Sequence, residues 1–189
     1  GISLPRRCES VSLDSHPRST DAAALARLGA IHPGGVQTAG NSCAVVDGAA
    51  AALVARASAG QPGLANLLAT AVVGVAPQRM GIGPVPAIQL LLKRSGLALD
   101  AIDLFEINEA QGAQVLAVAQ ALELDRQKLN CRGGSIALGH PLAATGLRLV
   151  LTLARQLREQ NLRYGIAAAC VGGGQGMAVL IENPHFSTI

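Results

Sequence analysis

The segment LAATGLRLVLTLARQLREQ at residues 142–160 constrains the fold of this chain more than any other feature. Its first three turns, read as a helix, are apolar or small on nearly every side, and charged residues gather only from Arg155 onward. A helix without a polar face is normally buried between layers of secondary structure. One sheet can cover only one of its faces, so we expect a second layer on the other face, from a missing part of the chain or from a partner.

The amino-acid composition also favours tight layers. Half of the 189 residues are apolar, but only three are aromatic: Phe105, Tyr164 and Phe186. The core must therefore consist of Ala, Leu, Val and Ile, with Gly where backbones approach closely. The length is enough for one domain with a real hydrophobic core.

The order helix–strand–helix–strand–helix–strand–strand predicts an α/β layered fold with a mixed sheet. A short helix is expected after the capping residues 19–21, and residues 49–55 fit either a strand or a helix. Residues 67–76 are expected to form a buried strand. The other expected elements are strands at 102–108, 165–173 and 176–182 and helices at 83–96 and 110–124.

Composition and charge argue against several classes of function. The net charge of +3 is spread thinly, without the clustered basic and aromatic residues of a nucleic-acid groove, although it would suit a ligand with phosphates. The four cysteines form no C-x-x-C pair and the four histidines no H-x-x-x-H pair, so no metal site is expected. The longest apolar stretch is too short for a membrane span. The first residues do not resemble a signal peptide, so we expect a cytoplasmic protein.

Asn108 stands in an Asn-Glu-Ala segment, where an expected strand meets an expected helix. An amide at such a junction can donate a hydrogen bond to a ligand oxygen or hold a water. The competing interpretation is a helix N-cap, a position at which Asn is favoured.

His140 ends the glycine-rich segment GGSIALGH at 133–140 and directly precedes the long helix. Glycines let the backbone pass close to a substrate, and an imidazole there can act as a base or as an oxyanion donor. A histidine that only caps the helix is the competing interpretation. The segment lacks the Lys-Ser/Thr ending of a phosphate-binding loop.

Cys170 ends an apolar strand and opens onto the run VGGGQG at 171–176. A thiol facing free backbone N–H groups is typical of an activated cysteine, whereas a buried and inert strand cysteine is the competing interpretation. The glycines lack the G-x-G-x-x-G spacing and the following helix of a dinucleotide site.

Taken in this order, the three segments resemble those of the thiolases (acetyl-CoA acyltransferases), whose C-terminal half carries Asn-Glu-Ala, Gly-Gly to Gly-His-Pro, and Cys-x-Gly-Gly-Gly-x-Gly. TAGNSCAVVDGAAA at 38–51 and MGIGPVPA at 80–87 also fit, and the resemblance runs from about residue 14 to residue 182. It implies one α/β half of an αβαβα sandwich. Residues 1–36 would then end a loop region and connecting segment, and residues 37–189 would form the C-terminal domain.

The resemblance also implies roles for individual residues. His140 would activate a nucleophilic cysteine and help to bind the thioester oxygen, and Asn108 would hold a water at the same oxyanion site. Cys170 would move the α-proton of acetyl-CoA, and the N–H of Gly172 would help to form a second oxyanion site. The residues expected along the acyl-CoA path are Ala39, Cys43, Met80, Ala110 and Gln111.

Two of these positions depart from the family pattern. Gln111 stands where the family often has Phe, and Cys43 stands where many members have Ser. Both changes affect the expected acyl pocket, so the sequence does not fix the preferred acyl chain.

The family's acylated cysteine belongs to an N-terminal half, and none of Cys8, Cys43 and Cys131 stands in its context. We therefore expect this chain alone to be inactive and to need an N-terminal half or subunit. Together they would transfer an acyl group between an acyl-enzyme and acetyl-CoA, by Claisen condensation or by thiolysis of 3-ketoacyl-CoA. CoA thioesters are the expected substrates, no cofactor is expected, and the protein is expected to be a homo-oligomer.

Two alternatives remain at this point. The chain would serve as a non-catalytic interaction or oligomerisation module if the missing nucleophile reflects a lost activity. It would otherwise belong to a condensing enzyme related to ketoacyl synthases, but those usually have a histidine where Cys170 stands, so the cysteine favours thiolase chemistry.

Overall fold

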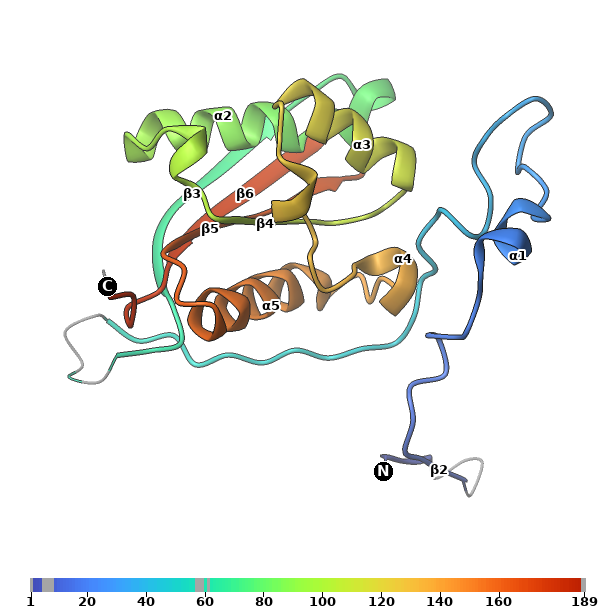
Figure 1. Ribbon diagram of the computed structural model, residues 1–189, viewed down its shortest axis with the longest axis horizontal. Helices are drawn as coiled ribbons and strands as arrows, with labels where there is room; N and C mark the ends of the chain where they lie inside the picture. The colour runs from blue at the N-terminus through green and yellow to red at the C-terminus, as the bar shows by residue number, and fades with distance from the viewer. Residues whose placement is uncertain (1, 5–8, 57–59, 61, 188–189) are drawn as a thin grey trace.

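The computed structural model describes residues 2–4, 9–56, 60 and 62–187 of the chain. A four-stranded sheet forms its centre, with helices α2 and α3 on one face and helix α5 on the other (Figure 1). The strands of this sheet are β3 (Asn66–Gly74), β4 (Leu104–Ile107), β5 (Tyr164–Val171) and β6 (Gln175–Glu182). The helices around it are η2 (Pro77–Ile82), α2 (Pro84–Ser95), η3 (Leu99–Ala101), α3 (Gly112–Ala121), η4 (Arg126–Lys128), α4 (Ser135–Leu138) and α5 (Thr145–Glu159).

The sheet is mixed, with the strand order β3-β6-β5-β4. β5 and β6 form an antiparallel hairpin, β3 joins β6 antiparallel, and β4 joins β5 parallel. This arrangement confirms the predicted α/β fold.

The chain before the sheet lies outside these layers. β1 (Ile2–Leu4) pairs with β2 (Glu9–Val11), and α1 (Ala22–Ala26) is capped by the Asp21 carboxylate, within the predicted capping residues. The chain then runs without regular structure along the outer side of α5 (Figure 1). Residues 49–55 are thus neither the strand nor the helix that their sequence allowed, and a domain boundary after residue 36 stays a prediction.

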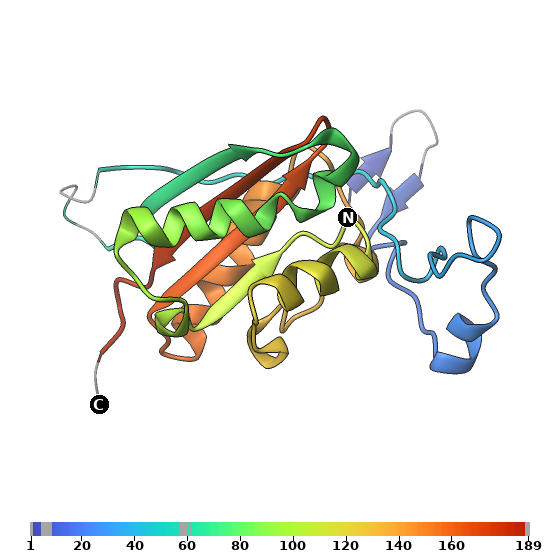
Figure 2. The same cartoon turned by 90° about the horizontal axis from the view of Figure 1, so that it is seen from above.

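The core between the sheet and helices α2 and α3 is aliphatic, as the composition predicts. The two helices lie next to each other over this face (Figure 2). Phe105 is the only buried aromatic side chain in the described part of the chain. The fully buried aliphatic side chains of this layer are Ile88, Leu91, Ile102, Ile107, Val118, Ile166 and Leu180.

Helix α5 covers the opposite face of β4, β5 and β6. Leu149, Leu153 and Leu157 recur every four residues and form its buried stripe, the spacing that places side chains on one helix face. Gly165 of β5 admits this close packing, because a Cβ there would lie 2.8 Å from Leu153. The helix begins at Thr145, later than residue 142. On its outer side, the described residues contribute only the irregular segment that Figure 1 shows, so the second layer stays a prediction.

The strand predicted at residues 67–76 is present as β3, but the prediction that it is buried is wrong. β3 is an edge strand of which only Ala71 is buried, whereas Val72 is 59% exposed. One face of β3 packs under α2, but α5 lies under the other three strands and leaves the second face open. The sequence pattern did not contain the strand order that produces this exposure.

Helix α3 is shorter than the predicted helix at 110–124. Gln111 has extended backbone angles and is the N-cap residue, so the helix starts at Gly112. At its C-terminal end, Glu123 adopts a positive φ of 54°, which ends the helical path.

Glu106 is a buried carboxyl group in the middle of β4. It is 1% exposed, and one of its oxygens accepts a hydrogen bond from Gln156 Nε2 at 2.8 Å. Burial raises the pKa of Glu106 to about 7, against smaller lowering effects of Gln156 and Arg148. Its second oxygen and Gln156 Oε1 are both buried without a hydrogen-bond partner. Both atoms are acceptors when Glu106 is ionised, so a proton on Glu106 would supply the hydrogen-bond donor that this place lacks.

The pKa of Glu106 predicts a pH-dependent stability. The folded state binds this proton more tightly than the unfolded state, so the stabilisation is complete below the unfolded pKa and is lost as the pH rises through about 7. The difference is on the order of 3 kcal/mol. The free energy of unfolding of the unsubstituted protein, measured by urea denaturation, should therefore fall between pH 5 and pH 8. The free energy of unfolding of Glu106→Gln should not show this fall. An equal fall in both proteins would contradict the assignment.

The hairpin from β5 to β6 touches the start of α2 without room for a side chain. A Cβ on Gly176 would lie 2.0 Å from the carbonyl oxygen of Gly83, a distance that no real Cβ contact allows. Because both sides of this contact are backbone, no side chain can move to relieve it.

We therefore predict that Gly176→Ala lowers the free energy of unfolding by about 2 kcal/mol or more, as overpacking does. Gly146→Ala is the matched control, since a Cβ at this position in α5 meets nothing within 4 Å. That substitution should stabilise the helix by roughly 0.5–1 kcal/mol. Urea denaturation of both variants measures the difference, and equal stability of the two would contradict the close contact.

Candidate active site

Two of the predicted site residues meet where β4 and β5 end. The two strands are parallel, so their carboxyl ends lie at the same edge of the sheet, the edge at which α/β proteins bind ligands. Asn108 directly follows β4 and donates its backbone N–H to the Ala168 carbonyl at 2.9 Å. Cys170 lies two residues further along β5, at the same edge, and is 8% exposed.

The loop that carries His140 is anchored to the free side of β4. Asn130 takes the place of a neighbouring strand there: its N–H donates to the Phe105 carbonyl at 2.9 Å, and its side chain bonds the N–H and C=O of Ile107. Its backbone then turns through a positive φ of 49°. The chain is thereby directed from the edge of β4 into the glycine-rich loop.

Glu109 fixes the glycine-rich loop by hydrogen bonds to its carboxylate. Its carboxylate accepts hydrogen bonds from the N–H of Ile136 at 3.1 Å and from Asn130 Nδ2 at 3.0 Å. Gly134 leaves the space for it, because a Cβ there would lie 2.3 Å from the Glu109 carboxyl carbon. The Asn-Glu-Ala segment therefore also positions the histidine loop.

A third segment, residues 41–45, joins the other two by backbone contacts. The His140 N–H donates to the Ala44 carbonyl at 2.8 Å, and the Cys43 N–H donates to the Ala110 carbonyl at 3.2 Å. Ser42 pairs with Gln111 in an isolated bridge. The segments around Asn108, His140 and Cys43 thus meet at one edge of the sheet.

The Thr145 hydroxyl lies against one nitrogen of the His140 ring. The ring Nδ1 lies 2.6 Å from the Thr145 hydroxyl, and that hydroxyl donates to the Pro141 carbonyl at 3.0 Å. With its one proton directed to this carbonyl, the hydroxyl accepts from Nδ1–H, and Nε2 keeps its lone pair. Burial lowers the pKa of His140, and the Arg148 guanidinium lowers it further. The imidazole is therefore neutral and able to accept a proton at Nε2.

Asn108 is not a helix cap, since the N-cap of α3 is Gln111. Its side chain is buried, and its Oδ1 accepts a hydrogen bond from the Ser135 hydroxyl at 2.6 Å. The amide nitrogen has no acceptor in the described part of the chain, yet it is not closed off from solvent. The side chain thus presents N–H groups without a partner at this edge.

Cys170 and Gly172 stand at the turn of the hairpin. Burial raises the pKa of the Cys170 thiol, and the nearby Cys43 adds to this, so the group is a thiol at neutral pH. Gly172 is exposed, and its N–H donates to no described acceptor. A proton-bearing thiol near the end of β5 is therefore followed, two residues later, by an N–H donor without a described acceptor.

The remaining predicted binding residues lie at different distances from this edge. Cys43, Ala110 and Gln111 belong to the contacts just described. Met80 is half-buried in η2, which packs against β5 and α3. Ala39 is exposed on a turn of the segment before Asn41 and has no described contact with the edge residues.

Three residues at this site escaped sequence reasoning: Thr145, Ser135 and Arg148. The first two lie within or just after the glycine-rich segment, where only His140 drew attention. Arg148 was the visible signal, because a lone arginine among apolar helix positions calls for a buried partner. That partner is the Ser135 hydroxyl, which accepts from Arg148 Nη2 at 3.1 Å.

Other chemistry has little support in the described residues. Cys131 is exposed, and Cys8 lies outside the described residues. No three His, Cys, Asp or Glu side chains gather into a candidate metal site in the described part of the chain. None of the helices described here combines the length and the apolar character needed to cross a bilayer.

Comparison with known proteins identifies this arrangement. The family model described as "Thiolase, C-terminal domain" matches residues 61–183. The chain is 49% identical over 180 residues to a beta-ketoadipyl-CoA thiolase of Pseudomonas aeruginosa, covering 91% of this chain and 45% of that protein. The chain thus spans about half the length of the curated relatives it matches.

Solved structures agree. The structure of human mitochondrial 3-ketoacyl-CoA thiolase has a TM-score of 0.87 at 39% identity, over 97% of this chain and 48% of that one. A structure of the human enzyme in complex with CoA has a TM-score of 0.80 at 36% identity, over 92% of this chain and 45% of that one. A match of this extent, in sequence and in fold, shows that the chain belongs to the thiolase family and contains its C-terminal domain.

Proposed function

We propose that this chain supplies the acid–base half of an acyltransferase site. The site would transfer an acyl group between an acyl-enzyme cysteine and acetyl-CoA, by Claisen condensation or by thiolysis of 3-ketoacyl-CoA. The observation that carries this proposal is that the backbone of residues 43–44 bonds to His140 and to Ala110, at the sheet edge where Asn108 leaves β4 and Cys170 lies in β5. The names of the similar proteins, which are CoA thiolases, support the class of substrate.

His140 acts as the base for the nucleophilic thiol. The Thr145 hydroxyl holds Nδ1 as the donor, so the Nε2 lone pair accepts the thiol proton when the sulfur attacks a carbonyl carbon. That carbon belongs to the acyl-CoA thioester in condensation and to the 3-keto group in thiolysis. The imidazolium N–H formed in this step then donates to the oxygen that gains negative charge. Asn108 adds a second donor there, through its free amide N–H or a water held by it.

Cys170 moves the proton of the second substrate. In thiolysis, its thiol donates the proton to the α-carbon of the departing acetyl-CoA enolate, which suits a group whose pKa is raised by burial. In condensation, the Cys170 thiolate removes that proton, and the resulting carbanion attacks the acyl-enzyme carbonyl. This step forms the carbon–carbon bond and breaks the thioester bond, which releases the nucleophilic cysteine as its thiolate. The Gly172 N–H stabilises the enolate oxygen in both directions.

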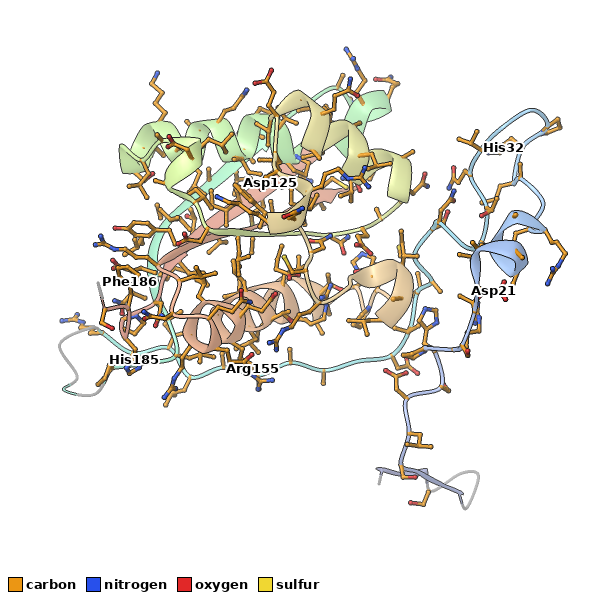
Figure 3. The ribbon with its side chains drawn as sticks, in the orientation of Figure 1. Asp21, His32, Asp125, Arg155, His185 and Phe186 are labelled. Atoms are coloured by element: carbon orange, nitrogen blue, oxygen red, sulfur yellow. The ribbon has the colours of Figure 1, made fainter. Side chains whose placement is uncertain are left out.

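The acylated cysteine comes, in this proposal, from an N-terminal half. Support for such a half lies on the outer side of α5, where an open cavity of about 520 Å³ separates the helix from residues 49–51. Arg155 lies on this outer side of the helix (Figure 3). A covering layer would complete the burial of α5 and bring a thiol within reach of His140.

A chimaeric enzyme tests this proposal. The N-terminal half of the Pseudomonas aeruginosa relative, joined to this chain, should cleave acetoacetyl-CoA with CoA, measured as the loss of enolate absorbance, whereas the chain alone should not. His140→Ala and Cys170→Ala in the chimaera should each lower the rate about 10²- to 10⁴-fold. Cys131→Ala, at an exposed thiol away from the site, is the matched control and should keep the rate. A folded but inactive chimaera would favour a non-catalytic module.

The tautomer of His140 gives a sharper prediction. Thr145→Val keeps the shape of a side chain that is 2% exposed but removes the acceptor for Nδ1–H, so the ring loses its fixed orientation. We expect kcat/KM of the chimaera to fall about tenfold to a hundredfold, whereas Thr145→Ser, which keeps the hydroxyl, should retain most of it. Steady-state kinetics measures both variants, and an equal effect of the two would contradict the role of the hydroxyl.

A further inference from the structure

Ser135 and Arg148 form a chain of hydrogen bonds that ends at the carboxamide oxygen of Asn108. Its Oδ1 accepts from the Ser135 hydroxyl at 2.6 Å, and the oxygen of that hydroxyl accepts from Arg148 Nη2 at 3.1 Å. Ser135 is 0% exposed and Asn108 2% exposed. The hydrogen bond between them is thus shielded from water, which makes it both stronger and more costly to leave unmade.

The direction of this chain of hydrogen bonds is fixed by Arg148. A guanidinium donates and never accepts, so the Ser135 oxygen must be the acceptor toward Arg148. The hydroxyl has one proton, and its acceptor is the Asn108 oxygen. With the carboxamide turned over, the Ser135 oxygen would face two donors and its own proton would have no acceptor among the described groups.

Fixing the oxygen of Asn108 also fixes its nitrogen. Nδ2 is then the end of the carboxamide that keeps access to solvent at the carboxyl edge of the sheet. The positive charge of Arg148 polarises the Ser135 hydroxyl, which in turn polarises the carboxamide, because hydrogen bonds in a chain strengthen one another. The result is a stronger N–H donor at a place where negative charge develops on oxygen.

We propose that Ser135 and Arg148 are positioning residues for Asn108: Arg148 orients the Ser135 hydroxyl, and this hydroxyl turns the Asn108 N–H groups toward the reacting oxygen. This inference deepens the proposed acyltransferase site and rests on it. Arg148 comes from the second turn of α5, and Ser135 opens α4. The helix that bears Thr145 thereby positions both donors of the oxyanion site.

Arg148 lies near two carboxyl groups but forms no ion pair with either of them among the described residues. Glu106 and Glu109 act on it from β4 and from the residues after it, and its Nε and Nη1 are buried without a partner. Its charge also acts on the imidazole of His140. Removal of the charge should therefore have an effect on His140 that removal of the Ser135 hydroxyl should not have.

A double-mutant cycle in the chimaera tests the inference. Ser135→Ala should lower kcat about tenfold to a hundredfold with little change in KM, and it should cost nothing further in an Asn108→Ala background. Ser95→Ala is the matched control, because that hydroxyl binds the Leu92 carbonyl at the end of α2. Losses that multiply in the double variant would overturn the inference, since Ser135 would then not act through Asn108.

A second measurement needs no turnover. In ¹H–¹⁵N spectra of the purified chimaera, the side-chain amide signals of Asn108 are assigned by their loss in Asn108→Ala. They should shift in Ser135→Ala and in Arg148→Met and stay in place in Ser95→Ala. The pKa of His140, from its ring signals, should rise in Arg148→Met and stay unchanged in Ser135→Ala. Unshifted Asn108 signals in both variants would overturn the inference.

The two proposals fail in different ways. An inactive chimaera whose Asn108 signals shift as expected would contradict the acyltransferase site and leave the positioning chain standing. An active chimaera with unshifted Asn108 signals would contradict the positioning chain and leave the acyltransferase site standing. Arg148→Lys keeps a donor and a charge, so partial recovery of kcat relative to Arg148→Met is expected, and no recovery would speak against the hydrogen-bond chain.

Discussion

The parallel pairing of β4 with β5 is the interaction on which the rest of the structure depends. It is the one parallel strand pair of an otherwise antiparallel sheet in the described residues, and it brings the ends of two strands with different functions to the same edge. The register of Ile107 with Ala168 sets where Asn108 leaves the sheet relative to Cys170. A slip of one residue would turn the buried side chains of β4 to the opposite face.

Helix α5 has two tasks that usually belong to different elements. Its leucine stripe closes one face of the sheet, and its first two turns supply Thr145 and Arg148 to the site. The packing of α5 against the sheet therefore also places the partners that orient His140 and Asn108. A shift of α5 on the sheet would move the partners of His140 and Asn108 together.

The sequence predicted the local features well, because their causes are local. The prolines and the glycine that bound α2, the apolar runs of β5 and β6, and the glycines around Cys170 act within a few residues. The exposure of β3 could not be predicted, because it follows from an edge position that sequence distance does not encode. The start of α3 at Gly112 is another such case: Gln111 is drawn into an extended bridge with Ser42, 69 positions earlier in the chain.

The sequence names candidate reactive groups but not the side chains that contact them. Asn108, His140 and Cys170 were recognisable from glycine-rich surroundings and their order. The contacts of Thr145, Ser135 and Arg148 depend on which side chains meet after folding, and a serine among glycines gives no sign of the carboxamide it will bind. Arg148, the only arginine among the apolar positions of the first turns of α5, was the exception, since burial of a charge always needs an explanation.

The buried thiol of Cys170 has a consequence for the chemical durability of the site. Alkylating agents and peroxides attack the thiolate, and access and deprotonation together set the rate. A thiol that is nearly closed off from solvent and keeps its proton at neutral pH offers these reagents neither access nor a thiolate. The group that would carry a proton in each catalytic turnover is therefore, at rest, poorly reactive toward oxidants and alkylating agents.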